Sequence, residues 1–126
     1  MPKIYLSGPI DNCSPEQAVG WRNQLKEDYK QYEFLDPIDV ENYLSNPTAA
    51  IEQEKFHILE SDVFLCYPWK PSTGTPMEAM FAYVNDKIVV TVSEGTYLSE
   101  WIKYHSNYVA LSFPNAMNWI NARYKI

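Results

Sequence analysis

Apolar residues occur along the chain in short uninterrupted runs that alternate with longer segments of helical periodicity. The runs predict β-strands at residues 3–7, 33–35, 63–67, 87–92 and 108–112. Between and after them, helices are predicted over residues 15–32 and 48–60, from residue 75, around residues 98–102, and from residue 114. Strands that are apolar throughout are typical of a sheet covered by helices on both faces.

The repeated strand–helix order predicts an α/β fold. We expect a single doubly wound domain over residues 1–126, with a five-stranded, mainly parallel sheet of the Rossmann-like or flavodoxin-like kind. Ligands of such sheets bind beyond the carboxyl ends of the strands. The expected site segments are therefore residues 7–12, 36–39 and 67–75, and those that follow residue 92.

The third predicted helix has apolar residues at helical spacing, which predict the face that it buries: Met77, Met80, Phe81 and Val84. The start of this helix allows two interpretations. Residues 75–78 (TPME) fit a capping box, in which Thr75 is the N-cap and the Glu78 side chain returns to the N-cap amide. The same position would also hold an ionised carboxylate at the positive end of a helix, where it could act as a nucleophile.

Composition and charge narrow the possible partners. The net charge of −6 argues against a groove for a nucleic-acid polymer, which needs a basic surface. A single nucleotide remains a possible ligand, because backbone amides at a helix N-terminus can bind one phosphate. Aromatic residues make up 15% of the chain, and we expect some of them in a pocket or a subunit interface.

No cofactor or metal is expected. The sequence has neither a GxGxxG loop nor a P-loop, and Cys13 and Cys66 lack the spacing and the His partners of a zinc site. No signal peptide and no run of about 20 apolar residues is present, so we expect no membrane partner. The expected location is the cytoplasm, with both thiols free.

Three segments, at residues 4–9 (IYLSGP), 60–62 (ESD) and 74–82 (GTPMEAMFA), resemble the nucleoside 2-deoxyribosyltransferase family, which includes the related 2′-deoxynucleoside 5′-monophosphate N-hydrolases. The resemblance implies that Glu78 attacks the anomeric carbon and forms a covalent deoxyribosyl ester. It also implies that Tyr5 holds Glu78 in place and that Asp62 interacts with the base and helps to protonate it. A helix-to-strand turn is the other interpretation of Asp62.

The departures from the family pattern bear on the substrate. Ser72 stands where the transferases have a second Asp, and together with Ser7 it favours a substrate with a 5′-phosphate. The Gly- and Arg-rich turn of the hydrolases is missing after Ile10. Trp21 and Arg22 could supply a stacking ring and a cation instead, or they could be a core residue and a solvated helix residue.

Further substrate contacts are expected from the turns at the carboxyl ends of the strands, namely Gly8, Pro9, Ile10, Asp36 and Gly74. Family members complete each pocket with residues of a neighbouring subunit, and Asn107 is the best match for such a residue. The resemblance therefore implies a homodimer or a larger homo-oligomer.

Several functions remain open. The favoured one is cleavage of the N-glycosidic bond of a 2′-deoxynucleoside or its 5′-monophosphate, with transfer of the sugar to another nucleobase. In the alternatives, water accepts the sugar, the substrate is another nucleotide such as a nicotinamide dinucleotide, or the protein binds a nucleotide without catalysis.

Overall fold

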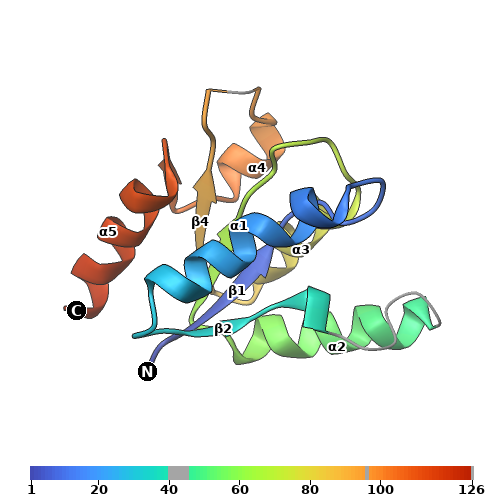
Figure 1. The fold of residues 1–126 in the computed structure, drawn as a ribbon, viewed down its shortest axis with the longest axis horizontal. Helices are drawn as coiled ribbons and strands as arrows, with labels where there is room; N and C mark the ends of the chain where they lie inside the picture. Colours follow the sequence, from blue (N-terminus) through green and yellow to red (C-terminus); the bar gives the residue numbers. More distant parts are fainter. Residues whose placement is uncertain (40–45, 96, 126) are drawn as a thin grey trace.

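The computed structural model describes residues 1–39, 46–95 and 97–125. Strands and helices alternate along it (Figure 1). The strands are β1 (Lys3–Ser7), β2 (Glu33–Leu35), β3 (Val63–Cys66), β4 (Ile88–Val92) and β5 (Tyr108–Ala110). The helices are α1 (Pro15–Asp28), the short 3₁₀ turn η1 (Pro37–Asp39), α2 (Pro47–Glu60), α3 (Gly74–Val84), α4 (Glu100–Tyr104) and α5 (Phe113–Tyr124). The predicted α/β class is confirmed.

The five strands of the described residues are parallel and lie in the order β2-β1-β3-β4-β5. Ile4 lies opposite both Phe34 of β2 and Val63 of β3, so β1 is an interior strand. The chain passes from β1 to β2 on one side and then returns to β3 on the other side. In sheets of this order, ligands bind at the carboxyl edge between the first and third strands, where the winding changes direction.

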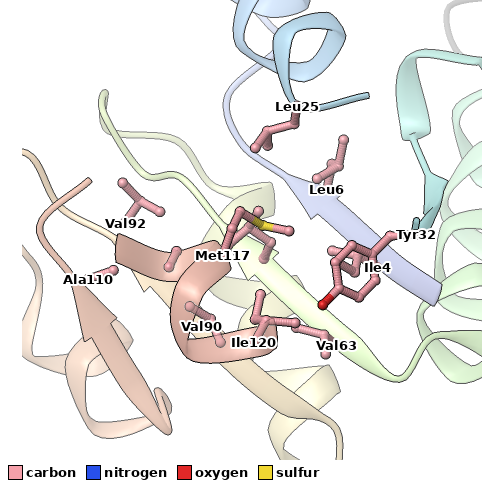
Figure 2. Packing of buried hydrophobic residues seen from close by; sticks show 12 residues of the cluster. Ile4, Leu6, Leu25, Tyr32, Val63, Val90, Val92, Ala110, Met117 and Ile120 are labelled. Carbon is pink, nitrogen blue, oxygen red and sulfur yellow. The ribbon is translucent and has the colours of Figure 1, made fainter. Parts of the chain in front are cut away.

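Each face of the sheet has its own buried cluster, because successive side chains of a strand point to opposite faces. On one face, β1, β3 and β4 pack against α1 and α5 through residues that include Leu6, Leu25 and Met117 (Figure 2). On the other face, Tyr5 and Phe64 pack with residues of α2, α3 and α4. Ser7 points to the same face as Tyr5, since it lies two residues further along β1.

Local signals explain where α1 begins, while packing decides where it ends. Ser14 and Gln17 form a capping box, with Pro15 in the first turn. The helix ends at Asp28 and not at Tyr32 as predicted. The Tyr32 ring is buried in the core and its hydroxyl donates to Asn121, and these contacts place Tyr32 outside the helix.

The predicted buried face of α3 is wrong except at Phe81, which is partly buried and packs against the core. Met77, Met80 and Val84 are 68%, 48% and 62% exposed, and the helix instead buries Thr75, Ala79 and Ala82. Small side chains on the inner face let the helix lie close to the sheet. As a result, Met77, Met80 and Val84 lie on the surface.

Candidate active site

Glu78 is the fifth residue of α3, just beyond its first turn, and two hydroxyl groups of β1 bind its carboxylate. The Tyr5 hydroxyl donates to Oε2 at 2.7 Å, and the Ser7 hydroxyl donates to Oε1 at 2.7 Å. Both donors lie on the same face of β1, two residues apart, and α3 packs against that face. The two carboxylate oxygens are thereby fixed at the carboxyl edge of the sheet.

This geometry corrects the capping-box interpretation. α3 begins at Gly74, one residue before the predicted start, and its N-cap residue is Thr73. Thr73 makes no side-chain capping hydrogen bond, and Thr75 is a buried residue of the first turn. The Glu78 carboxylate binds β1 hydroxyls, so its contacts link a helix to a strand.

The surroundings of Glu78 have opposing effects on its charge. Burial raises the pKa of Glu78, while the hydrogen bonds from Ser7 and Tyr5 and the positive charge of Arg22 lower it. Burial and the neighbouring Glu78 raise the pKa of Tyr5, so the phenol keeps its proton and remains a donor. A buried carboxylate with both oxygens hydrogen-bonded can be held in one orientation for attack.

Sequence reasoning missed a second carboxylate, Glu54 of α2. Its side chain is buried and lines the same cavity as Glu78. Burial, followed by the negative charge of Glu78, raises the pKa of Glu54 to about 7. A signal for it exists in the sequence: Ala50, Glu54 and Ile58 recur every four residues and form the buried face of α2.

The cavity has a volume of 720 Å³, which is in the range of small-molecule sites. Its walls come from the β1–α1 loop, α2, the β3–α3 loop and the start of α3. Six of the predicted site residues line it: Gly8, Pro9, Ile10, Ser72, Gly74 and Glu78. Lys55 and Lys70 are basic residues on its walls.

Two predicted site residues lie at the opposite, amino edge of the sheet. Asp62 directly precedes β3 and accepts a hydrogen bond from the Lys3 backbone amide at 2.8 Å. Asn107 directly precedes β5, and its side-chain oxygen accepts from the Val89 amide at 2.7 Å. Parallel strands run the length of the sheet between this edge and Glu78, so the structure does not bring these residues together with it.

Three further predicted contacts lie behind the β1–α1 turn and outside the cavity lining. Trp21 packs against Tyr67 and Phe113. Arg22 is fully buried and pairs with the buried Asp36 at 2.9 Å. Arg22 is therefore neither a free cation for a substrate phosphate nor the solvated helix residue of the alternative interpretation.

Three other features of the described residues concern metal binding, thiol reactivity and membrane-spanning helices. Within them, no three His, Cys, Asp or Glu side chains are grouped so that they could hold a metal ion. Cys13 and Cys66 are free thiols, and burial raises the pKa of Cys66 to about 12. No described helix has the length and apolar character needed to cross a membrane.

Neither the family models nor the curated proteins include a match to this chain. Several solved structures do match this chain. A 2-deoxyribosyltransferase from Bacillus psychrosaccharolyticus has a TM-score of 0.72 and 22% identity, over 92% of this chain and 90% of that one. The CMP N-glycosidase BcmB from Clostridium botulinum has a TM-score of 0.61 and 17% identity, over 94% and 98%.

The response regulator TrrA from Thermotoga maritima also matches, with a TM-score of 0.61 and 15% identity over the whole of both chains. A signalling protein and an N-glycosidase thus resemble this chain equally well in backbone. The chain has the fold of the 2-deoxyribosyltransferases, as the sequence resemblance implied. The fold does not determine the activity, which has to be argued from the site.

Proposed function

We propose that this protein is an enzyme that cleaves the N-glycosidic bond of a 2′-deoxynucleoside or its 5′-monophosphate, with Glu78 as the nucleophile. One observation carries the proposal: in a cavity of suitable size, both oxygens of a buried carboxylate are bound by Tyr5 and Ser7. Two of the proteins with similar structures are named for transferring deoxyribose or for cleaving CMP.

The proposed mechanism has two steps, as in retaining glycosidases. In the first, Glu78 attacks the anomeric carbon while the bond to the base breaks, and the base takes up a proton. In the second, a nucleobase or water attacks the glycosyl ester and loses its proton, and Glu78 leaves as a carboxylate. A 2-deoxy sugar suits this path, because it lacks the hydroxyl that destabilises an oxocarbenium-like transition state.

Glu54 is the best candidate for the proton transfers. Burial raises the pKa of both carboxyl groups, that of Glu54 to about 7, so the pair can hold a proton at neutral pH. Only Glu78 has two hydroxyl donors, Tyr5 and Ser7, which favour its ionised form and leave the proton to Glu54. Two carboxyl groups of which one is ionised and one protonated are typical of a nucleophile and an acid in one site. In the second step, ionised Glu54 would take the proton of the incoming base or water.

A 5′-phosphate would lie near the start of α3. Ser72, Lys70 and Gly74 line the cavity there, with open space beside Gly74, and the first amides of a helix attract anions. The Lys70 ammonium donates to the Asn12 carbonyl and has further N–H donors for a phosphate. Ser7 no longer contributes to this argument, because its hydroxyl is bound to Glu78. We therefore expect a 5′-monophosphate to be accepted, with Ser72 and Lys70 as its contacts.

The enzyme is proposed to work as a homodimer or a larger homo-oligomer. Exposed apolar side chains lie on α3 (Met77, Met80 and Val84) and on α4 (Trp101 and Tyr104), and the ring contact of Tyr83 with Tyr104 joins the two helices. We take these residues as the interface surface. This surface begins at the cavity, since Met77 also lines it. Large exposed apolar patches are typical of protein interfaces. The two free thiols fit a cytoplasmic location.

The test is to incubate the protein with a deoxynucleoside or its 5′-monophosphate, with and without a second base, and to separate the products by chromatography. Exchange of the base supports the transferase, and free deoxyribose or deoxyribose 5-phosphate supports the hydrolase. Binding without cleavage would support the non-catalytic alternative. Cleavage of a nicotinamide dinucleotide alone would contradict the proposed substrate class.

A further inference from the structure

Arg22 is the largest fully buried side chain of the protein's described part, and it is charged. Its guanidinium group donates to the carbonyl oxygens of Ala18 at 2.9 Å, Leu6 at 2.8 Å and Gly8 at 3.0 Å, and to Asp36 at 2.9 Å. Burying an ion pair gives little net stability, and apolar side chains of similar volume often serve as well. Stability alone therefore does not explain why a charged side chain is buried at position 22.

Two of its acceptors lie on either side of Ser7. The pairing of β1 with β2 ends at Tyr5, so β2 offers no partner to the Leu6 carbonyl, and Arg22 supplies the missing donor. On the other side of β1, the Ser7 carbonyl accepts from the Tyr67 amide at 2.8 Å. The carbonyls of residues 6, 7 and 8 are thus all bound, and the Ser7 backbone is held from both sides.

The turn of residues 6–8 packs closely against Trp21 and Arg22. A Cβ atom at Gly8 would lie 2.8 Å from the Trp21 ring and 3.1 Å from the Tyr67 carbonyl oxygen, so only glycine allows this approach. Asp36 orients the guanidinium group from the end of β2 and also binds Lys26 at 2.8 Å. Arg22 itself lies outside the cavity lining and reaches the reaction only through the turn.

We infer that Arg22 is a positioning residue of the proposed reaction: it fixes the turn of residues 6–8 so that the Ser7 hydroxyl holds Glu78 in the orientation for attack. This inference rests on the proposed function of Glu78. The positive charge of Arg22 acts in the same direction on Glu78, because it lowers the pKa of that carboxyl group.

The experiment is a double-mutant cycle of Arg22→Lys and Ser7→Ala. Lysine keeps the charge but cannot bind all four acceptors at once. With Ser7 present, Arg22→Lys should lower kcat by roughly 10- to 100-fold, as expected for a misplaced reacting group, and change KM less than about threefold. With Ala at position 7, the same change should lower kcat by less than about threefold, because the contact through which Arg22 acts is already gone.

A second readout needs no substrate. The hydrogen bond from Ser7 lowers the pKa of Glu78, so Arg22→Lys should raise that pKa when Ser7 is present and leave it unchanged in the Ser7→Ala protein. Titration of the Glu78 carboxyl carbon by NMR measures this. An inactive wild type with a coupled titration would reject the proposed function and keep the positioning role. Equal effects of Arg22→Lys in both backgrounds would overturn the inference.

Lys26→Met is the matched control. It removes a partner of Asp36 but leaves every bond to the turn, so it should lower stability while kcat stays within about twofold. If Arg22→Lys does not fold, Asp36→Asn loosens the guanidinium group more mildly. It should lower kcat in the same direction, and the loss should again depend on Ser7; a loss independent of Ser7 would count against the inference.

Discussion

Polar side chains gather at both edges of the sheet, but they bind different partners there. At the carboxyl edge, Tyr5 and Ser7 bind the side chain of Glu78 next to an open cavity. At the amino edge, Asp62 and Asn107 bind backbone amides of neighbouring strands. The first arrangement buries a carboxylate, which costs free energy. The raised pKa of Glu78 reflects this cost, because burial disfavours the charged form. The second satisfies amides that would otherwise lack partners.

The two edges should therefore respond to mutation in opposite ways. Changes at the carboxyl edge should remove activity and leave stability equal or higher, because functional sites hold charges in unfavourable surroundings. Changes at the amino edge should lower stability and spare activity. Each prediction below tests one side of this contrast.

The largest effect is expected from Glu78→Gln, which should lower kcat by at least roughly 10³-fold because the amide cannot form the glycosyl ester. The free energy of unfolding at neutral pH should be equal to or above that of the wild type, since a buried charge is removed. Mass spectrometry of the quenched wild-type reaction should detect a protein heavier by one deoxyribosyl group. Glu52→Gln, which changes an exposed carboxylate of α2, is the matched control. Near-normal turnover by Glu78→Gln would reject the nucleophile assignment.

The next effect is on pH dependence. The first step needs one proton on the two carboxyl groups, held by Glu54 while Glu78 is ionised, so kcat/KM should fall as pH rises through about 7. Glu54→Gln should lower kcat by roughly 10²-fold or more and abolish the fall near pH 7. An alkaline limb that persists in Glu54→Gln would assign the proton transfers to another group.

Stability gives an independent measure of Glu54. Its pKa is raised in the folded protein, so its contribution to stability is complete below the unfolded pKa and is lost as pH rises through about 7. Above pH 7, Glu54→Gln should therefore be more stable than the wild type in urea unfolding, and near pH 4 the difference should vanish. A variant less stable than the wild type at pH 8 would contradict the buried position of this carboxyl group.

The sequence predicted the fold well because the strands are apolar throughout and turn or cap residues mark where most helices begin. The position of Glu78 could also be predicted, since it depends only on a helix that starts at the carboxyl edge of the sheet. The resemblance implied a role for Asp62 at the base, but Asp62 comes before β3, and residues that precede a parallel strand lie at the amino edge, away from Glu78.

Glu54 and Arg22 show what sequence patterns could not decide. Each is a charged residue on a helix face that the structure buries, with Ala50 and Ile58 beside Glu54. Interpreting charged residues as solvated is sound on average, because burial of a charge is rare without a partner. Whether a partner exists depends on contacts between distant segments, such as that of Arg22 with the Leu6 carbonyl.

Asn107→Ala tests the amino edge. It leaves the Val89 amide without its side-chain acceptor, so the free energy of unfolding should fall by about 1 to 3 kcal/mol. The kcat/KM should stay within about twofold of the wild type. A loss of activity without a loss of stability would instead support the role that the sequence resemblance implied for Asn107, as a residue of a neighbouring subunit's pocket.

The smallest effect is expected from Asp62→Asn. The side chain is exposed and accepts one hydrogen bond from the Lys3 amide, and the amide oxygen of asparagine can still accept it. Stability should therefore change by less than about 1 kcal/mol, and kcat/KM with its whole pH profile should be unchanged. The neighbouring Tyr124 provides a local reporter, because burial and then the Asp62 charge raise its pKa. Spectrophotometric titration should find the Tyr124 pKa lowered in Asp62→Asn, which would demonstrate that the substitution acted where the structure places it. If kcat/KM fell tenfold or more while the Tyr124 titration stayed the same, Asp62 would have to act at the base after all, and the contrast between the two edges would fail.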